Sequence, residues 1–155
     1  MKPTAESKPS GAKPDPRFHH VLVPTDLTER TEKALQLADK LVASDGARIT
    51  LIHVIETIDG VELDELKPFF ERLEKKARTA MTRLARGVPT EGAQVESVVA
   101  YGRRAAEIVK FAAENEVDLI VLASHRVNPS MVNRDWGTIS YKVGILAQCP
   151  VLLVK

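Results

Sequence analysis

The fold is decided by residues 21–55, VLVPTDLTERTEKALQLADKLVASDGARITLIHVI, in which two apolar runs flank a helical pattern. The first run, Val21–Val23, is short and closed by Pro24, as is typical of a strand buried on both faces. Between residues 34 and 42 the apolar side chains recur at helical spacing. Residues 49–55 predict a second buried strand. A strand, a helix and a strand in this order predict a parallel pair joined by a right-handed crossover.

The same alternation continues to the end of the sequence. Residues 63–84 carry an apolar side chain every three or four positions, and Gly87 marks the end of that predicted helix. Pro68 marks either the true first turn of this helix or a kink in it. The remaining predicted elements are a strand at 95–99, a helix at 105–112 ended by Asn115, a strand at 118–123, a helix at 137–147 and a strand at 150–154. Nine alternating elements predict an α/β fold with a five-stranded parallel sheet and helices on both faces.

Composition narrows the class of protein. The chain has 155 residues, of which 44% are hydrophobic and 28% are charged, as in an ordinary globular domain. Residues 1–17 are rich in proline and lysine and predict a flexible arm, so residues 18–155 are expected to form a single domain. A net charge of +1 argues against nucleic-acid binding, and no apolar run is long enough to cross a membrane. The single cysteine, Cys149, is in keeping with a cytoplasmic protein.

The candidate site follows the first and fourth predicted strands, because ligands of open parallel sheets bind at the carboxyl ends of strands. Pro24, Thr25 and Asp26 follow the first strand, and residues 123–136 follow the fourth. The Asp26 carboxylate can accept hydrogen bonds from a base or a ribose. The alternative is that Asp26 only caps the next helix, for which Thr28 is the other predicted N-cap.

Four segments carry a resemblance to a known family: VLVPTDLTERTEKALQLADKLV, ARITLIHVIE, YGRRAAEIVKFAAENEVDLIVLASH and GTISYKVGILAQCPVLLVK. They resemble the universal stress protein (Usp) family over residues 18–155. The resemblance implies a Rossmann-like, doubly wound fold with sheet order 3-2-1-4-5, and usually a homodimer. It also implies that the chain is one of two kinds, since some members of the family bind ATP and others do not.

The ATP-binding members carry a glycine-rich loop after strand four, with two residues between its first two glycines, nine before the third, and then Ser or Thr. Glycines there let backbone N–H groups approach phosphate oxygens at the start of a helix. This sequence keeps Gly137 and Thr138 but has no glycine at the first two positions in either possible register. Ala123 and Arg126 occupy them if ten residues precede Gly137, and Ser124 and Val127 occupy them if nine do. We therefore predict weak or no binding of ATP.

If ATP or AMP does bind, with magnesium, the resemblance assigns ten residues to it: Pro24, Thr25, Asp26, Val54, Ala123, Ser124, His125, Arg126, Gly137 and Thr138. Other chemistry is not predicted, and no residue is assigned a catalytic or metal-binding role. His53 is interpreted as a hydrogen-bonded core histidine. The neighbouring His19 and His20 point to opposite faces of a strand, so they do not form a metal site. Cys149 is interpreted as structural.

Two hypotheses about function remain. The first is a cytoplasmic, dimeric stress-response protein that acts as a binding or interaction module without catalysis. The second is a protein that binds an adenine nucleotide in the crevice after strands one and four, with slow hydrolysis of ATP. In both, the dimer is predicted to form through the apolar edge strand Val151, Leu152, Leu153 and Val154, which needs a cover. The alternative is a monomer in which the arm, residues 1–17, covers this edge. We expect Leu152→Pro to disrupt that edge.

Overall fold

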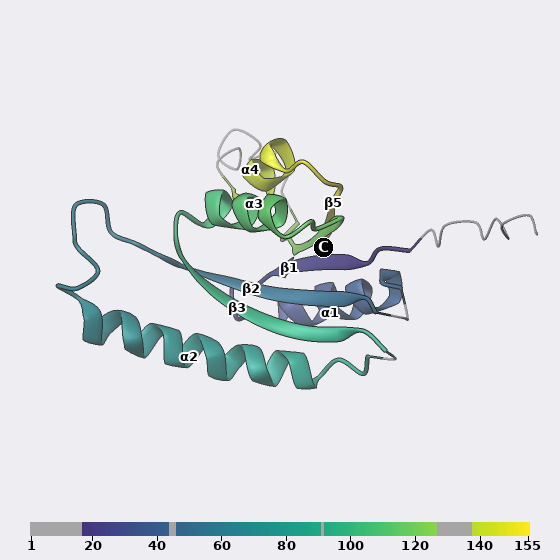
Figure 1. The fold of residues 1–155 in the computed structure, drawn as a ribbon, viewed down its shortest axis with the longest axis horizontal. Coiled ribbons are helices and arrows are strands. Elements are labelled where there is room, and N and C mark those ends of the chain that lie inside the picture. Colours follow the sequence, from purple (N-terminus) through teal and green to yellow (C-terminus); the bar gives the residue numbers. More distant parts are fainter. Residues whose placement is uncertain (1–16, 44–45, 91, 127–137) are drawn as a thin grey trace, which may run out of the picture.

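The structure is a computed structural model and describes residues 17–43, 46–90, 92–126 and 138–155. Its elements alternate as the sequence predicts (Figure 1). They are β1 (His20–Pro24), α1 (Arg30–Leu41), β2 (Arg48–Glu56), α2 (Lys67–Arg86), β3 (Gln94–Gly102), α3 (Arg104–Glu114), β4 (Leu119–Ala123), α4 (Ile139–Leu146) and β5 (Val151–Val154). The predicted arm, up to residue 16, and Gly137 lie outside the described residues.

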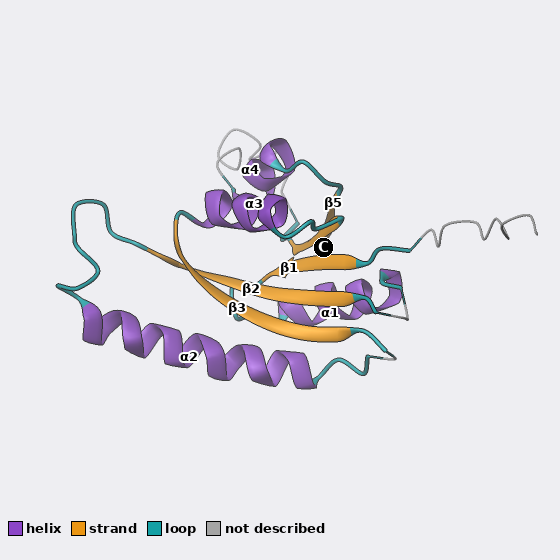
Figure 2. Ribbon diagram, in the orientation of Figure 1, coloured by secondary structure: helices purple, strands orange, loops and turns teal. Residues whose placement is uncertain are grey.

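The five strands form one parallel sheet in the order β3-β2-β1-β4-β5, which confirms the prediction. β1 is the central strand: Val21 pairs with Ile49 of β2 on one side and with Leu119 of β4 on the other. Among the described residues β5 pairs only with β4, so its other edge, called the free edge below, has no strand partner in that part of the chain. The helices cover both faces, with α1 and α2 on one face and α3 and α4 on the other (Figure 2).

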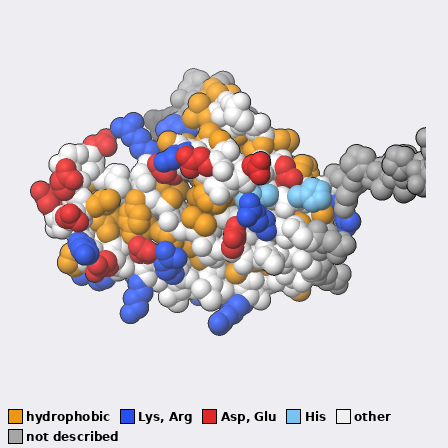
Figure 3. All heavy atoms as spheres, viewed as in Figure 1, with side chains coloured by type: hydrophobic (Ala, Val, Ile, Leu, Met, Phe, Trp, Pro, Cys, Tyr) orange, Lys and Arg blue, Asp and Glu red, His pale blue; other side chains and the backbone are white. Residues whose placement is uncertain are grey.

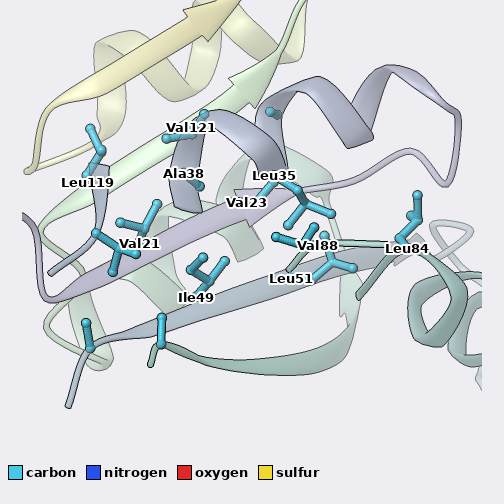
Figure 4. Packing of buried hydrophobic residues seen from close by; sticks show 14 of the residues in the cluster. Val21, Val23, Leu35, Ala38, Ile49, Leu51, Leu84, Val88, Leu119 and Val121 are labelled. Atoms are coloured by element: carbon cyan, nitrogen blue, oxygen red, sulfur yellow. The ribbon is translucent and has the colours of Figure 1, made fainter. Parts of the chain in front are cut away.

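Each face of the sheet has its own apolar core. On the first face, side chains of β1, β2 and β4 pack against Leu35 and Ala38 of α1 and Leu84 of α2 (Figure 4). On the second face, Leu22, Ile52 and Ile120 pack against α3 and α4. Because β1 contributes to both cores, Val21, Leu22 and Val23 are all fully buried. This double burial explains why the strand reads as a continuous apolar run.

Two helix starts differ from the prediction. α2 begins at Lys67 rather than near residue 63, and Pro68 lies in its first turn, the first of its two predicted roles, where its missing N–H costs nothing. α1 begins at Arg30 with Glu29 at the N-cap position, so the prediction that Thr28 is the N-cap is wrong. The Thr28 hydroxyl instead donates to Oδ1 of Asp26 at 2.5 Å. Among the described helices, none has the length and apolar character needed to span a membrane.

Candidate functional site

A crevice opens at the carboxyl ends of β1, β2 and β4, where the strand order changes direction. Its volume is about 250 Å³. It brings together seven of the ten predicted nucleotide-binding residues: Pro24, Thr25, Asp26, Val54, Ala123, His125 and Thr138. Ser124 and Arg126 are not among its lining residues, and Gly137 lies outside the described residues.

The turn after β1 is fixed by hydrogen bonds of Thr25. Its N–H donates to the Ile52 carbonyl at 2.8 Å, which ties the turn to β2. Its buried hydroxyl accepts the N–H of Leu27 at 2.9 Å and shares a hydrogen bond with the Thr31 hydroxyl at 2.8 Å. Leu27 has a φ of 66°, a left-handed conformation that few non-glycine residues adopt. Asp26 lies between Thr25 and Leu27, so these contacts fix its position at the mouth of the crevice.

Asp26 is held as a carboxylate. Its Oδ1 accepts the N–H of Thr28 at 3.0 Å as well as the Thr28 hydroxyl, and its Oδ2 accepts from Arg30 at 3.0 Å. Burial raises the pKa of Asp26, but the Thr28 hydrogen bonds and the Arg30 charge outweigh burial, so the pKa lies below its ordinary value. Asp26 therefore stabilises the turn before α1 without occupying the N-cap position, and it presents a negative charge to the crevice.

His53 contributes a second polar group. Its Nδ1 lies 2.9 Å from the Thr25 carbonyl oxygen, which can only accept, so Nδ1 carries the proton in this contact. In the neutral ring Nε2 is then left as an acceptor. His53 is hydrogen-bonded, as the sequence predicted. The sequence did not predict that His53 also lines the crevice.

The walls between these polar groups are apolar and come from strands and helices on the second face of the sheet. Val54, Ile108 and Leu122 are buried lining residues, and Ile139 lies beside them at the start of α4. A slot with apolar walls and a few polar groups at its mouth suits a flat heterocycle that carries hydrogen-bonding groups at its edge.

Arg30 and Arg104, which were not among the predicted site residues, also line the crevice. Arg30 pairs with Asp26 at 3.0 Å, and Arg104, the first residue of α3, pairs with Glu56 at 3.4 Å. The position of Arg30 four residues after Asp26 is a signal that could have identified it. Arg104 follows the end of β3, which also lies at this edge of the sheet.

Of the predicted site residues that the structure describes after β4, Ser124 and Arg126 do not line the crevice. Ser124 is buried, and its N–H donates to the Val154 carbonyl at 2.7 Å. Its hydroxyl accepts from Nζ of Lys155 at 3.2 Å, so the side chain is turned toward the end of β5. Thr138 lines the crevice and also caps α4 by accepting the N–H of Tyr141 at 3.4 Å. Arg126 is exposed.

The other two histidines of the first strand region behave as the sequence suggested. His20 is buried, with its ring nitrogens 2.8 Å from the Asn115 carbonyl and 2.9 Å from the Thr50 hydroxyl. His19 is exposed, and its backbone N–H donates to Asp118. Within the described ranges, no group of three His, Cys, Asp or Glu side chains could hold a metal ion.

Cys149 is half-buried, and burial together with the negative charge of Asp118 raises its pKa. A raised pKa lowers the fraction of thiolate, the reactive form, at neutral pH. We expect iodoacetamide at pH 8 to modify Cys149 at least about fivefold more slowly than an exposed thiol. The control is a Cys149→Ala, Ala106→Cys variant, whose new thiol lies at an exposed position of α3. Equal rates for the two thiols would contradict this prediction.

Comparisons with known proteins agree on one family. A family model described as "Universal stress protein family" matches residues 17–155. A universal stress protein of Thermus aquaticus, from the QAH/OAS sulfhydrylase 3' region, is 31% identical over 144 residues, covering 89% of this chain and 99% of the relative.

Two solved structures share the fold. The MJ0577 protein of Methanocaldococcus jannaschii superposes with a TM-score of 0.72 at 26% identity, covering 89% of this chain and 96% of that chain. The universal stress protein of Archaeoglobus fulgidus in complex with dAMP has a TM-score of 0.64 at 18% identity, covering 89% and 98%.

Proposed function

Because the chain belongs to the universal stress protein family, we propose that it is a dimeric, non-catalytic binding module of the cytoplasm. Its ligand in the crevice is an adenine nucleoside monophosphate, and ATP is held only weakly. The observation that carries the proposal is an apolar slot with the fixed Asp26 carboxylate at its mouth. A dAMP complex of a protein with the same fold supports the class of ligand.

The preference for a monophosphate follows from the groups available to phosphate oxygens. A triphosphate needs several N–H donors that only glycine allows to approach closely, and the chain has no glycine between Gly102 and Gly137. The side-chain cations that line the crevice, Arg30 and Arg104, already face the carboxylates of Asp26 and Glu56. One phosphate can be met by such side chains, whereas the second and third lack the glycine-lined cradle that the sequence does not provide.

Titration with AMP and with Mg·ATP tests this proposal. We expect ATP to bind with a dissociation constant above ~100 μM, equivalent to only about 5 kcal/mol, and AMP to bind at least as tightly. Asp26→Asn should weaken AMP binding by about tenfold, the effect of losing one charged hydrogen bond. The matched control is Asp64→Asn, an exposed carboxylate in the connection before α2. NMR titration of amide shifts measures affinities in this weak range. Low-micromolar binding of Mg·ATP would contradict the proposal.

The proposed dimer uses β5. The free edge of this strand is accompanied by exposed apolar side chains on α4 and on β5 itself, namely Ile145, Leu146, Leu152 and Leu153. A second copy that pairs with β5 about a two-fold axis would satisfy the free backbone groups and cover these side chains. Leu153→Pro, at this edge, tests the proposed pairing.

A further inference from the structure

One flank of α2 combines an apolar floor with positive charge. Phe69, Leu73 and Ala80 form the floor of a groove of about 620 Å³, and Arg72, Lys75, Lys76 and Arg83 rise around it. All of these residues lie on α2, and no acidic side chain lines the groove. We call this surface the basic flank.

The cations of the basic flank are not neutralised by their surroundings. None of the four forms an ion pair with a carboxylate in the ranges that the structure describes. Glu74 of α2 is engaged on another side of the helix, where it accepts from Arg78 at 2.7 Å and from the Tyr101 hydroxyl of β3. Four like charges beside an exposed apolar floor favour a negatively charged, partly apolar occupant.

The connection between β2 and α2 has the complementary character. Residues 58–65, which we call the acidic segment, contain the exposed carboxylates Asp59, Glu62, Asp64 and Glu65. Ile58 and Leu63 in the same segment are 52% and 45% exposed, which is high for large apolar residues. Figure 3 shows acidic side chains gathered at the end of the molecule where Figure 1 places this connection.

Within one chain the two surfaces do not meet. Asp59 pairs instead with Arg103, at 3.2 Å. The other three carboxylates of the acidic segment form no ion pair with a described residue. The segment ends at Glu65, two residues before Lys67, the first residue of α2, whereas the basic flank runs from Phe69 to Arg83. Both complementary surfaces are therefore open to a second molecule.

We propose that the basic flank docks the acidic segment of a second copy of this chain, and that the contact is reciprocal. Two α2 helices that meet antiparallel, about a two-fold axis near their N-terminal turns, place each acidic segment over the partner's Lys75, Lys76 and Arg83. These three cations then face Glu62, Asp64 and Glu65, the carboxylates of the segment that form no ion pair with a described residue, and exposed apolar side chains of both surfaces become covered. Helices aligned at their midpoints would oppose like charges, so the displaced arrangement is the one that charge favours.

This contact is separate from the proposed pairing of β5 and differs from it in salt dependence. The α2 contact rests on exposed charges, which about 0.5 M salt screens over a few ångströms. The β5 contact rests on backbone hydrogen bonds and apolar side chains, and it persists at that salt concentration. Sedimentation velocity at 50 and 500 mM NaCl should therefore show one salt-sensitive association step in the intact chain. We expect its dissociation constant to rise at least about tenfold at the higher salt.

Charge exchange tests the contact directly. A flank variant, K75E/K76E/R83E, and a segment variant, E62K/D64K/E65K, should each lose the salt-sensitive step when studied alone. Mixed one to one, they should associate with each other within about threefold of the original affinity, because both contacts of the mixed pair are again complementary. The control K33E/K40E/K110E changes the net charge by the same amount as the flank variant, at exposed positions of α1 and α3, and should retain the step.

Circular dichroism confirms that each variant is folded before its association is measured. Failure of the mixture to associate, with both variants folded, would overturn the proposal. The proposal would also be overturned if the wild-type chain showed no salt-sensitive step up to about 200 μM. That conclusion would hold even if the basic flank bound unrelated acidic proteins or polyanions. The test also applies if the proposed β5 dimer does not form, because the salt-sensitive step then joins single chains instead of dimers.

Discussion

Leu153→Pro is expected to convert the β5 dimer into single chains. The Ser124 N–H bonds to the carbonyl of Val154, and the Ile120 N–H to that of Pro150, so the backbone groups of these alternate residues of the fifth strand face β4. The groups of Val151 and Leu153 consequently point to the free edge. Proline at 153 removes an edge donor in both subunits. A loss of about 3 kcal/mol in total would raise the dissociation constant by at least ~100-fold.

Two further substitutions make this result specific. Leu153→Ala keeps the N–H and should leave the dimer within about tenfold of its original affinity. Leu152→Pro, which the sequence alone suggested, removes a donor that faces β4 inside the same chain, so it should lower the melting temperature as well. Light scattering coupled to size exclusion measures the mass of each variant. A Leu153→Pro chain that remains a dimer at tens of micromolar would show that the subunits meet elsewhere.

Met81→Ala is expected to cause a large loss of stability, because it truncates a side chain of α2 that is fully buried. Met81 is fully buried and packs with Ala77 and Leu84 against the first face of the sheet. Truncation leaves a cavity and removes apolar contacts, at a cost of about 2–5 kcal/mol. In a chain of this size the melting temperature should fall by about 5–15 °C.

Thr82→Ala is the matched control for this prediction. Thr82 is the next residue along α2, is exposed, and only donates its hydroxyl to the Arg78 carbonyl within the helix. Its replacement should change the free energy of unfolding by no more than about 0.5 kcal/mol. Thermal unfolding followed by circular dichroism compares the two variants. Similar melting temperatures for both would mean that α2 is not docked on the sheet as described.

The fold was predictable from the sequence because its strands are short apolar runs and its helices carry periodic apolar faces. β1 and β4 illustrate the first property, since each is buried by helices on both sides. Helix starts were less predictable. Residues 63–66 continue the apolar spacing of α2, yet Pro68 fixes the first turn and the helix begins one residue before it. Spacing reports which face is apolar and does not report where hydrogen bonding begins.

The site was predictable where position in the sheet decides it and less so where side-chain direction does. Asp26 follows the central strand directly, so its place at the crevice follows from topology alone. Ser124 also follows a strand, but its hydroxyl turns toward Lys155, a contact between residues 31 positions apart. Arg104 was not among the predicted site residues, because nothing in the local sequence shows that the end of β3 lies beside the crevice.

The central position of β1 has a consequence for how the molecule opens to solvent. Its amide groups bond to β2 and β4, and all its side chains are buried, so no local fluctuation frees it. Amide hydrogens of β1 therefore exchange with deuterated water only when the whole sheet separates, and their exchange rate reports the free energy of global unfolding. Those of Val151 and Leu153, at the free edge of β5, exchange by a separate route that a partner strand would close. One measurement of deuterium uptake thus reports both the free energy of unfolding of the subunit, from β1, and whether a partner strand is bound at the free edge of β5.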